Sequence, residues 1–157
     1  MNYPDIATLV PHSGPMVLLD RVLSADTDNL CAEVRIHPGS MFFDAAADNA
    51  GGGVGSWVGV EYMAQAIAAH AGWLALQHGD AVKVGFLLGS RKYEAARPLF
   101  AAGCVLQVHV HRVLQGETGL GAFECRIEDA NEMAATATIT VFQPNNVNEF
   151  LQDGSAV

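Results

Sequence analysis

Glu61 is the residue whose surroundings in the sequence most clearly suggest chemistry. It is the one charged residue in the apolar stretch 57–79. A buried carboxylate without partners is costly, and a desolvated carboxyl group is an effective general acid or base near neutral pH. We therefore expect Glu61 either to act in catalysis or, near the start of a helix, to be stabilised by the free backbone amides there. The catalytic alternative requires a dry site that a substrate can reach.

The histidines are the natural partners for such a carboxylate, and their spacing separates them from it. His70 follows Glu61 by nine residues, which at about 100° per residue places it on the opposite side of a helix. It shares that side with apolar residues such as Ile67, so we expect a buried, hydrogen-bonded core histidine. His109 and His111 offer metal ligands in principle, but no third ligand is in view, and we expect a solvated strand face. Neither a metal site nor a cofactor is predicted.

Small residues surround Glu61 on its own side of the predicted helix. Ala64, Gln65 and Ala68 lie near it at helical spacing. Such small side chains leave room either for tight packing against a sheet or for a narrow apolar channel beside the carboxylate. We expect these three residues to contact a bound substrate.

A glycine-rich run, GGGVG at 51–55, precedes the predicted helix. It lacks the G-K-[ST] ending of a phosphate loop and the register of a dinucleotide fingerprint, so nucleotide binding is not predicted. Gly53 and Gly55 instead allow a ligand to approach the amides at the helix start, where a carbonyl group of the ligand would be polarised. We expect the surrounding stretch 44–55 to be a mobile loop.

The hydrophobic pattern predicts the elements that must position these residues. One long helix is expected over 57–79, with Ser56 as its N-cap and Gly79 at its end. Because it carries a single charge, this helix has no solvated stripe and is expected to be buried on all sides. Short helical turns are expected over 4–9. Strands are predicted over residues 16–23, 30–37, 82–93, 104–114, 121–128 and 133–142.

This order of elements is typical of an α+β protein, in which an antiparallel sheet of about five or six strands curls around a central helix. The 157 residues are the length of one domain, and we expect a single domain over residues 1–157. Half of the residues are hydrophobic and 16% are charged, which is enough apolar surface to form a folded core.

The chain is acidic, with 8 Lys and Arg residues against 17 Asp and Glu residues and a formal net charge of −9. Such a surface repels nucleic-acid phosphates and anionic lipid, so neither is an expected partner. A membrane span over 57–79 is not expected, because Glu61, Gln65 and His70 would need partners in lipid. The three cysteines form no C-x-x-C pair and the first residues show no secretory signal, so a cytoplasmic location is expected.

Three segments carry a resemblance to a known family. Residues 9–22 read LVPHSGPMVLLDRV, residues 61–66 read EYMAQA, and residues 85–89 read GFLLG, followed by Arg97, Pro98 and Gly103. They resemble the L-P-H-R-x-P-F-L-L-V-D-R-V opening, the E-A-L-A-Q-A helix and the third-strand region of the β-hydroxyacyl-acyl-carrier-protein dehydratases of the hotdog fold. The variant E-Y-M-A-Q is most similar to the dehydratase-like proteins of aryl polyene pigment clusters.

The resemblance implies a hotdog domain that forms dimers, with active sites at the subunit interface and no cofactor. In that family the helix carboxylate works with a histidine from a G-H-F-P-G loop of the neighbouring subunit. The carboxylate corresponds to Glu61, but the matching stretch 42–53 contains no histidine. His37 is nearest in sequence and precedes the expected site. His12 is the better substitute; alternatively, it orders its own loop.

The reaction implied is loss of water from a 3-hydroxyacyl thioester, which gives the trans-2-enoyl thioester. It needs a base at the α-carbon and an acid at the β-hydroxyl. The resemblance implies Glu61 at the hydroxyl end, with His12, or else a histidine of a different, related subunit, as the base. A homodimer or a heterodimer with a related subunit is therefore expected. The alternatives are a non-catalytic or half-site acyl-binding subunit of a heteromeric dehydratase, and a hotdog thioesterase.

The resemblance also implies an acyl carrier protein, itself acidic, as the partner that delivers the acyl chain. Four of the eight basic residues lie within 83–97, where Glu94 is the only acidic residue. Arg91, Lys92 and Arg97 are therefore expected to dock the carrier protein and its phosphopantetheine phosphate. The alternative is a set of scattered, solvated charges.

Overall fold

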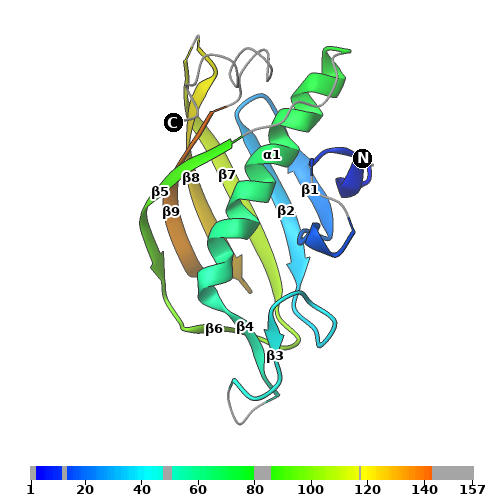
Figure 1. Cartoon of the computed structure of the whole chain (residues 1–157), viewed down its shortest axis with the longest axis vertical. Coiled ribbons are helices and arrows are strands. Elements are labelled where there is room, and N and C mark those ends of the chain that lie inside the picture. Colours follow the sequence, from blue (N-terminus) through cyan, green and yellow to red (C-terminus); the bar gives the residue numbers. More distant parts are fainter. Residues whose placement is uncertain (1–2, 12–13, 48–50, 80–85, 117, 143–157) are drawn as a thin grey trace.

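One long helix, α1 (Gly59–Gln77), runs through the centre of the fold (Figure 1). The computed structural model describes residues 3–11, 14–47, 51–79, 86–116 and 118–142. The helix predicted over 57–79 is confirmed, and it ends just before Gly79, which adopts a φ of 74°. Its start differs from the prediction. Ser56–Val58 form a 3-10 turn, η3, and the residue ahead of α1 makes no side-chain cap, so the prediction of Ser56 as N-cap is wrong.

Six strands of the described chain form one antiparallel sheet in the order β1-β2-β7-β8-β9-β5. The strands are β1 (Arg21–Ala25), β2 (Asn29–Arg35), β5 (Phe86–Ala95), β7 (Val105–Gln115), β8 (Leu120–Asp129) and β9 (Glu132–Phe142). β5 follows α1 in the sequence but lies at the far edge of the sheet, beside β9 (Figure 1). The predicted α+β architecture is confirmed. The first residues of the strand predicted over 82–93 lie outside the described residues.

A second, smaller sheet occupies part of the stretch that was predicted to be a loop. Its strands are β3 (Phe43–Asp44), β4 (Gly53–Gly55) and β6 (Leu99–Ala101), in that order. β4 pairs with β6, which lies more than forty residues further along the chain. The loop prediction is therefore wrong for 53–55, because this pairing depends on a partner that local sequence does not reveal. Residues 48–50 lie outside the described residues.

The predicted strand over 16–23 begins later than expected. Gly14–Met16 form a 3-10 turn, η2, and β1 starts only at Arg21. The reason lies in the helix, because the buried side chain of Gln65 hydrogen-bonds the backbone of Met16 and Leu18. Backbone groups that bind a side chain are not available for sheet pairing, so this apolar run packs as an irregular segment.

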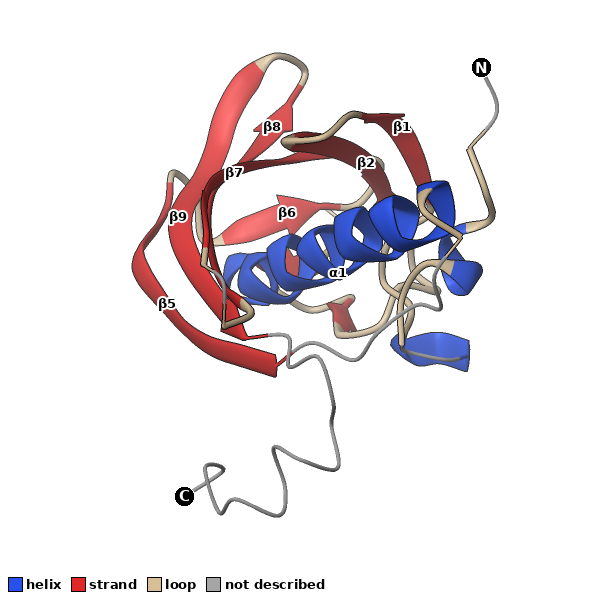
Figure 2. Cartoon of the chain, turned by 90° about the horizontal axis from the view of Figure 1, so that it is seen from above, coloured by secondary structure: helices blue, strands red, loops and turns tan. Residues whose placement is uncertain are grey.

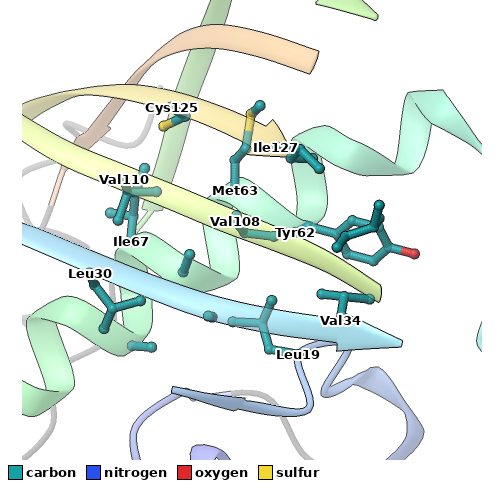
Figure 3. Packing of buried hydrophobic residues seen from close by; sticks show 14 of the residues in the cluster. Leu19, Leu30, Val34, Tyr62, Met63, Ile67, Val108, Val110, Cys125 and Ile127 are labelled. Atoms are coloured by element: carbon teal, nitrogen blue, oxygen red, sulfur yellow. The ribbon is translucent and has the colours of Figure 1, made fainter. Parts of the chain in front are cut away.

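The core fills the space between α1 and the concave face of the sheet. Leu106, Val108 and Val110 of β7 are buried, as the alternating pattern predicts. Met63 and Ile67 of α1 are buried against this face (Figure 3). The central helix and the central strands therefore stabilise each other mainly by burial of apolar surface.

The outer face of β2 is more buried than a half-solvated strand should be. Glu33 is 5% exposed there, and its carboxylate forms ion pairs with Arg21 at 2.9 Å and with Arg35 at 2.7 Å. Hydrogen bonds from Arg35 and Arg21 hold the pKa of Glu33 below its usual value. In a strand whose residues alternate between the core and the solvent, Glu33 would face the solvent. The side chains of Arg21 and Arg35 cover its carboxylate instead.

α1 is not buried on all sides, which corrects the prediction from its composition. The sheet curves over one side of the helix and leaves another side open (Figure 2). Trp57, just ahead of α1, is 64% exposed, Glu61 is exposed, and Ala64 and Ala68 are half-buried. One curved layer of strands cannot surround a helix completely. Among the described residues, no helix has the length and apolarity needed to cross a lipid bilayer.

Gly72 allows the N-terminal segment to reach the helix. The turns predicted over 4–9 are present as η1 (Ile6–Thr8), whose first turn is capped by the side chain of Asp5. The chain then passes close to α1 at Leu9. A Cβ atom at Gly72 would overlap the carbonyl oxygen of Leu9. Only glycine at this position lets the two backbones approach so closely.

Replacing Gly72 by alanine is expected to lower the free energy of unfolding by about 1–3 kcal/mol, because the added methyl group forces the backbone of Leu9 away from the helix. Urea unfolding followed by circular dichroism measures this change. Gly89→Ala is the matched control, since a Cβ atom there meets open space and should cost little. Equal unfolding free energies for the two variants would show that the close approach at Gly72 is not required.

Candidate active site

Glu61 lies in the first turn of α1, on the open side of the helix. Its carboxylate forms no hydrogen bond or ion pair with any other described residue. The free backbone amides of the first turn favour a negative charge at this position. In an isolated chain this stabilisation alone accounts for a glutamate there. Glu61 is exposed to water in the single chain, so the expectation of a buried Glu61 is wrong for the single subunit. The described residues do not provide the desolvated environment that general acid catalysis requires.

Tyr93 of β5 fixes the start of the helix that carries Glu61. Its hydroxyl group donates a short hydrogen bond to the carbonyl oxygen of Ser56 in η3. Burial raises the pKa of Tyr93 to about 12, so the hydroxyl stays protonated and remains a donor. Gly59 makes this contact possible, since a Cβ atom there would overlap the Tyr93 hydroxyl. The edge strand therefore sets the position of the first turn of α1.

Gly53 and Gly55 lie on β4, directly before η3, and Gly53 allows a close approach to the backbone of β6. A Cβ atom at Gly53 would overlap the carbonyl oxygen of Phe100, and one at Gly55 would overlap the indole ring of Trp57. Both glycines pair with residues of β6. A packing role therefore explains these glycines, and their predicted approach to a thioester carbonyl stays a prediction.

Gln65 is buried at 1% exposure and uses both ends of its amide group. Oε1 accepts a hydrogen bond from the backbone N–H of Leu18 at 2.8 Å, and Nε2 donates to the carbonyl oxygen of Met16 at 2.6 Å. The side chain thus fastens the segment between η2 and β1 to the helix. Its predicted contact with substrate, like those of Ala64 and Ala68, stays a prediction.

His70 is a buried core histidine, as its position opposite Glu61 predicts. It is 1% exposed, and its ring packs edge-on against Phe123. Nε2 lies 2.9 Å from the carbonyl oxygen of Asp26, so this nitrogen must carry the proton. Burial is the main cause that lowers the pKa of His70 below its ordinary value. His70 therefore stabilises the fold and does not face Glu61.

Three other histidines of the described chain, His37, His109 and His111, have partners other than Glu61. His37 lies in an exposed loop, where its Nδ1 accepts a hydrogen bond from Gly39 N–H at 3.0 Å. His109 lies 3.7 Å from Glu128, and His111 contacts Asn29 at 2.8 Å. No cluster of metal-ligating side chains occurs in the part of the chain that the structure describes. His12 lies outside the described residues.

The three basic residues that were predicted to dock a carrier protein have different surroundings in the structure. Arg97 is half-buried, and its guanidinium group bonds Asp129 at 2.8 Å and lies 3.9 Å from Glu132. Lys92 is exposed on β5, and the side chain of Arg91 lies outside the described part of the structure. The docking of a carrier protein at Arg91, Lys92 and Arg97 stays a prediction, and Arg97 already has partners within the chain.

Three aromatic residues near Glu61 were not identified from the sequence. Trp57 lies one turn before Glu61 on the open side, Tyr62 is its buried neighbour on α1, and Tyr93 anchors the helix start. A usable signal was present in the E-Y-M-A-Q variant, where a large tyrosine replaces the small residue that follows the helix glutamate. The role of Tyr93 depends on a contact across 37 residues, which the sequence does not reveal.

The fold defines the class of protein. A long helix held in a curved antiparallel sheet is the hotdog fold, and solved structures share it. A hypothetical thioesterase protein with coenzyme A from Streptococcus pneumoniae TIGR4 is 14% identical and covers 78% of this chain and 84% of its own, with a TM-score of 0.59. The smu.793 protein from Streptococcus mutans UA159, bound to acetyl CoA, is 13% identical over 78% and 86%, with a TM-score of 0.57. At such identities the likeness shows the fold alone.

Within this class, the chain belongs to the ApeP-like dehydratase family, whose sequence pattern matches residues 4–152. It is similar to a chain in the dehydratase heterocomplex ApeI:P from Xenorhabdus doucetiae, with 29% identity, coverage of 96% of this chain and 97% of that chain, and a TM-score of 0.86. No match is found among curated protein sequences. The resemblance to dehydratase-like hotdog proteins of aryl polyene clusters is thereby confirmed.

Replacing Gln65 by methionine is expected to destabilise the fold, because the N–H of Leu18 and the carbonyl of Met16 would lose their hydrogen-bond partner at a partly buried site. The expected cost is about 1–3 kcal/mol for the two groups together. Urea unfolding measures it. Gln77→Met, at the exposed end of α1, is the control and should change the unfolding free energy by less than about 0.5 kcal/mol. Similar values for the two variants would contradict the proposed role of Gln65.

His70 is expected to make the protein less stable as the pH falls. Because burial lowers its pKa in the folded state, the unfolded chain binds the proton more readily. The stabilisation is complete above the ordinary histidine pKa of 6.5 and is lost as the pH falls through the lower folded value. Unfolding free energies at about pH 7.5 and about pH 5.5 measure this loss.

The control compares His70→Gln with His111→Gln. The loss of stability between the two pH values should shrink in His70→Gln, because the titrating group is gone, and should persist in His111→Gln. His109, whose pKa burial also lowers, contributes a loss of the same sign that both variants retain. An unchanged pH dependence in His70→Gln would show that the proton-linked loss arises elsewhere.

Proposed function

We propose that this chain is one subunit of a heteromeric 3-hydroxyacyl-[acyl-carrier-protein] dehydratase, and that Glu61 forms half of a composite active site. The histidine of that site comes from a different, related subunit. One observation carries the proposal, namely that Glu61 projects from the open side of α1 without a partner in the described chain. The family assignment and the solved heterocomplex of a similar chain support it.

The open side of α1 has the properties of a surface that a second subunit covers. Glu61 is flanked there by the half-buried Ala64 and Ala68, whose small side chains allow close approach, and by the exposed Trp57. A subunit packed on this side would remove Glu61 from water. Desolvation of this kind makes a carboxyl group an effective proton donor near neutral pH. In this proposal, assembly with the second subunit excludes the water that surrounds Glu61 in the single chain.

We infer that the histidine comes from the second subunit, because this chain has none in the stretch that matches the histidine loop of the family. The stretch 42–53 contains no histidine, and His70 faces away from Glu61 with its ring bonded to Asp26. His37 already accepts a hydrogen bond from Gly39 within its own loop. His12 remains the alternative base within this chain, and the experiment below separates the two.

In the proposed reaction the substrate is a 3-hydroxyacyl thioester on an acyl carrier protein. The histidine removes a proton from the α-carbon, and the electron pair forms the α,β double bond. The β-hydroxyl leaves as water after it accepts a proton from the Glu61 carboxyl group. The products are water and the trans-2-enoyl thioester, and no cofactor takes part. The exposed Lys92 is expected to attract the acidic carrier protein.

The test measures dehydration by this chain alone, by a candidate related subunit alone and by the mixture. Mass spectrometry of a 3-hydroxyacyl carrier protein follows the loss of water, and a thiol reagent follows thioester hydrolysis. Activity is expected only in the mixture, without release of thiol. Glu61→Gln in the mixture should lower the rate by about a hundredfold or more, the usual loss for a general acid. Glu124→Gln, on the outer face of β8, should leave the rate unchanged.

Two outcomes decide against the composite site. Dehydration by this chain alone that His12→Ala abolishes would place the base in this chain. Full activity of the Glu61→Gln mixture would show that this chain is a non-catalytic subunit. Size-exclusion chromatography of each mixture confirms that the variants still assemble, so that a lost interface is not mistaken for lost chemistry. Release of thiol would instead indicate a thioesterase.

A further inference from the structure

The turn that leads into α1 is held at Ser56 from two sides. Ser56 is 8% exposed, and its backbone N–H donates a hydrogen bond to the carbonyl oxygen of Pro98 at 3.0 Å. Its own carbonyl oxygen accepts two hydrogen bonds, one from the N–H of Gly59 and one from the hydroxyl group of Tyr93. Gly59 is the first residue of α1, and Glu61 follows two residues later. Tyr93 and Pro98 both belong to the chain that runs from β5 to β6, below the start of α1 in Figure 1.

A bulge in β5 directs Tyr93 toward this turn. The register of β5 and β9 shifts between Arg91 and Glu94, so two residues of β5, Lys92 and Tyr93, lie opposite one residue of β9. Lys92 has a positive φ of 56° and is exposed, whereas Tyr93 is half-buried and bonds Ser56. Bulges of this kind change the direction of a side chain and are frequent next to active sites. The extra residue in the strand thus gives Tyr93 the inward direction that its bond requires.

The carbonyl group of Pro98 is positioned by the residues just ahead of it. The backbone N–H of Ala96 donates a hydrogen bond to the carbonyl oxygen of Ala134 in β9 at 2.8 Å. The guanidinium group of Arg97 bonds the carboxylate of Asp129, at the end of β8, at 2.8 Å. Because the proline ring fixes φ, Pro98 has little freedom once these two residues are held. Arg97, which was predicted to dock a carrier protein, therefore helps to hold the turn before α1.

We propose that Tyr93 and Arg97 are positioning residues of the dehydration reaction, and that they act through the backbone of Ser56 on the position of Glu61. The inference rests on the proposed function, in which Glu61 is the proton donor. The Glu61 carboxylate has no partner among the described residues, so the start of α1 alone determines where it lies. A displacement of about 1 Å in a reacting group can lower the rate by about a hundredfold. Neither Tyr93 nor Arg97 contacts the substrate in this proposal.

The first test measures kcat and KM for the mixture with the related subunit. Tyr93→Phe keeps the ring and removes the hydroxyl group that bonds Ser56. Its kcat should fall about tenfold and its KM for the carrier protein should change less than about twofold, because the bond positions the proton donor and not the docking surface. Tyr3→Phe is the matched control, since the Tyr3 hydroxyl also bonds the backbone, at the N–H of Ala25 at the end of β1. It should leave both constants unchanged.

A second pair of variants separates positioning from docking. Arg97→Gln removes the charge of the arginine, and Asp129→Asn keeps the arginine but removes the charge of its partner. Positioning predicts that both variants lower kcat by about threefold and leave KM for the carrier protein unchanged. If Arg97 docks the carrier protein instead, Arg97→Gln would raise KM, Asp129→Asn would not, and kcat would stay the same in both.

Hydrogen–deuterium exchange of the isolated chain gives a measurement that does not require activity. Peptides that cover residues 56–62 should exchange faster in Tyr93→Phe than in the natural chain, because the start of α1 loses a bond. The same peptides should exchange at the natural rate in Tyr3→Phe. Near-ultraviolet circular dichroism shows whether each variant is folded, and the Arg97 and Asp129 variants decide the question if Tyr93→Phe does not fold.

Two results in an active mixture would overturn the proposal. An unchanged kcat in Tyr93→Phe would show that the bond to Ser56 does not position the proton donor. An equal loss of kcat in Tyr3→Phe would show that the loss follows from lower stability in general. Inactivity of the natural mixture would instead defeat the proposed function, and the exchange of residues 56–62 would then decide by itself whether Tyr93 holds the turn.

Discussion

The structure depends on the packing of one apolar helix against a single curved layer of strands. Burial of residues such as Met63, Ile67 and Val108 between helix and sheet supplies most of the stabilisation. A single layer covers only part of the circumference of a helix, so another side of α1 is left uncovered. Glu61 lies on that side. The same constraint that forms the core therefore determines where the chain presents its one helix carboxylate.

The position of this carboxylate is fixed from three directions. Tyr93 of the edge strand bonds the turn ahead of α1, Gln65 fastens the segment before β1, and Gly72 admits the N-terminal turn. These contacts join parts of the chain that are far apart in sequence, and each involves a buried polar group or a close backbone approach. The helix that carries Glu61 is thus held in place by several contacts, although the carboxylate itself has no partner among the described residues, which agrees with the proposal that it acts after assembly.

A carboxylate that is held in place on a helix but exposed to water lacks the desolvated environment of a complete active site. General acid catalysis by a carboxyl group benefits from desolvation, and the described sheet and loops leave Glu61 exposed. In the proposed heteromeric dehydratase, this chain presents the carboxylate, and the other subunit covers it and adds the histidine. The fold alone does not establish this, because hotdog domains of low identity include proteins named as thioesterases. The proposal depends on the environment of Glu61.

The sequence by itself determined the helix, the order of the main strands, the core role of His70 and the family. Each of these follows from local periodicity or from short motifs. Only the tertiary structure decided that Glu61 is exposed, that Gln65 binds a backbone segment, that 53–55 form a strand, and that Tyr93 bonds the turn ahead of α1. These features depend on contacts between distant residues. The sequence of a helix shows that its residues are apolar. It does not show how far around the helix the sheet extends.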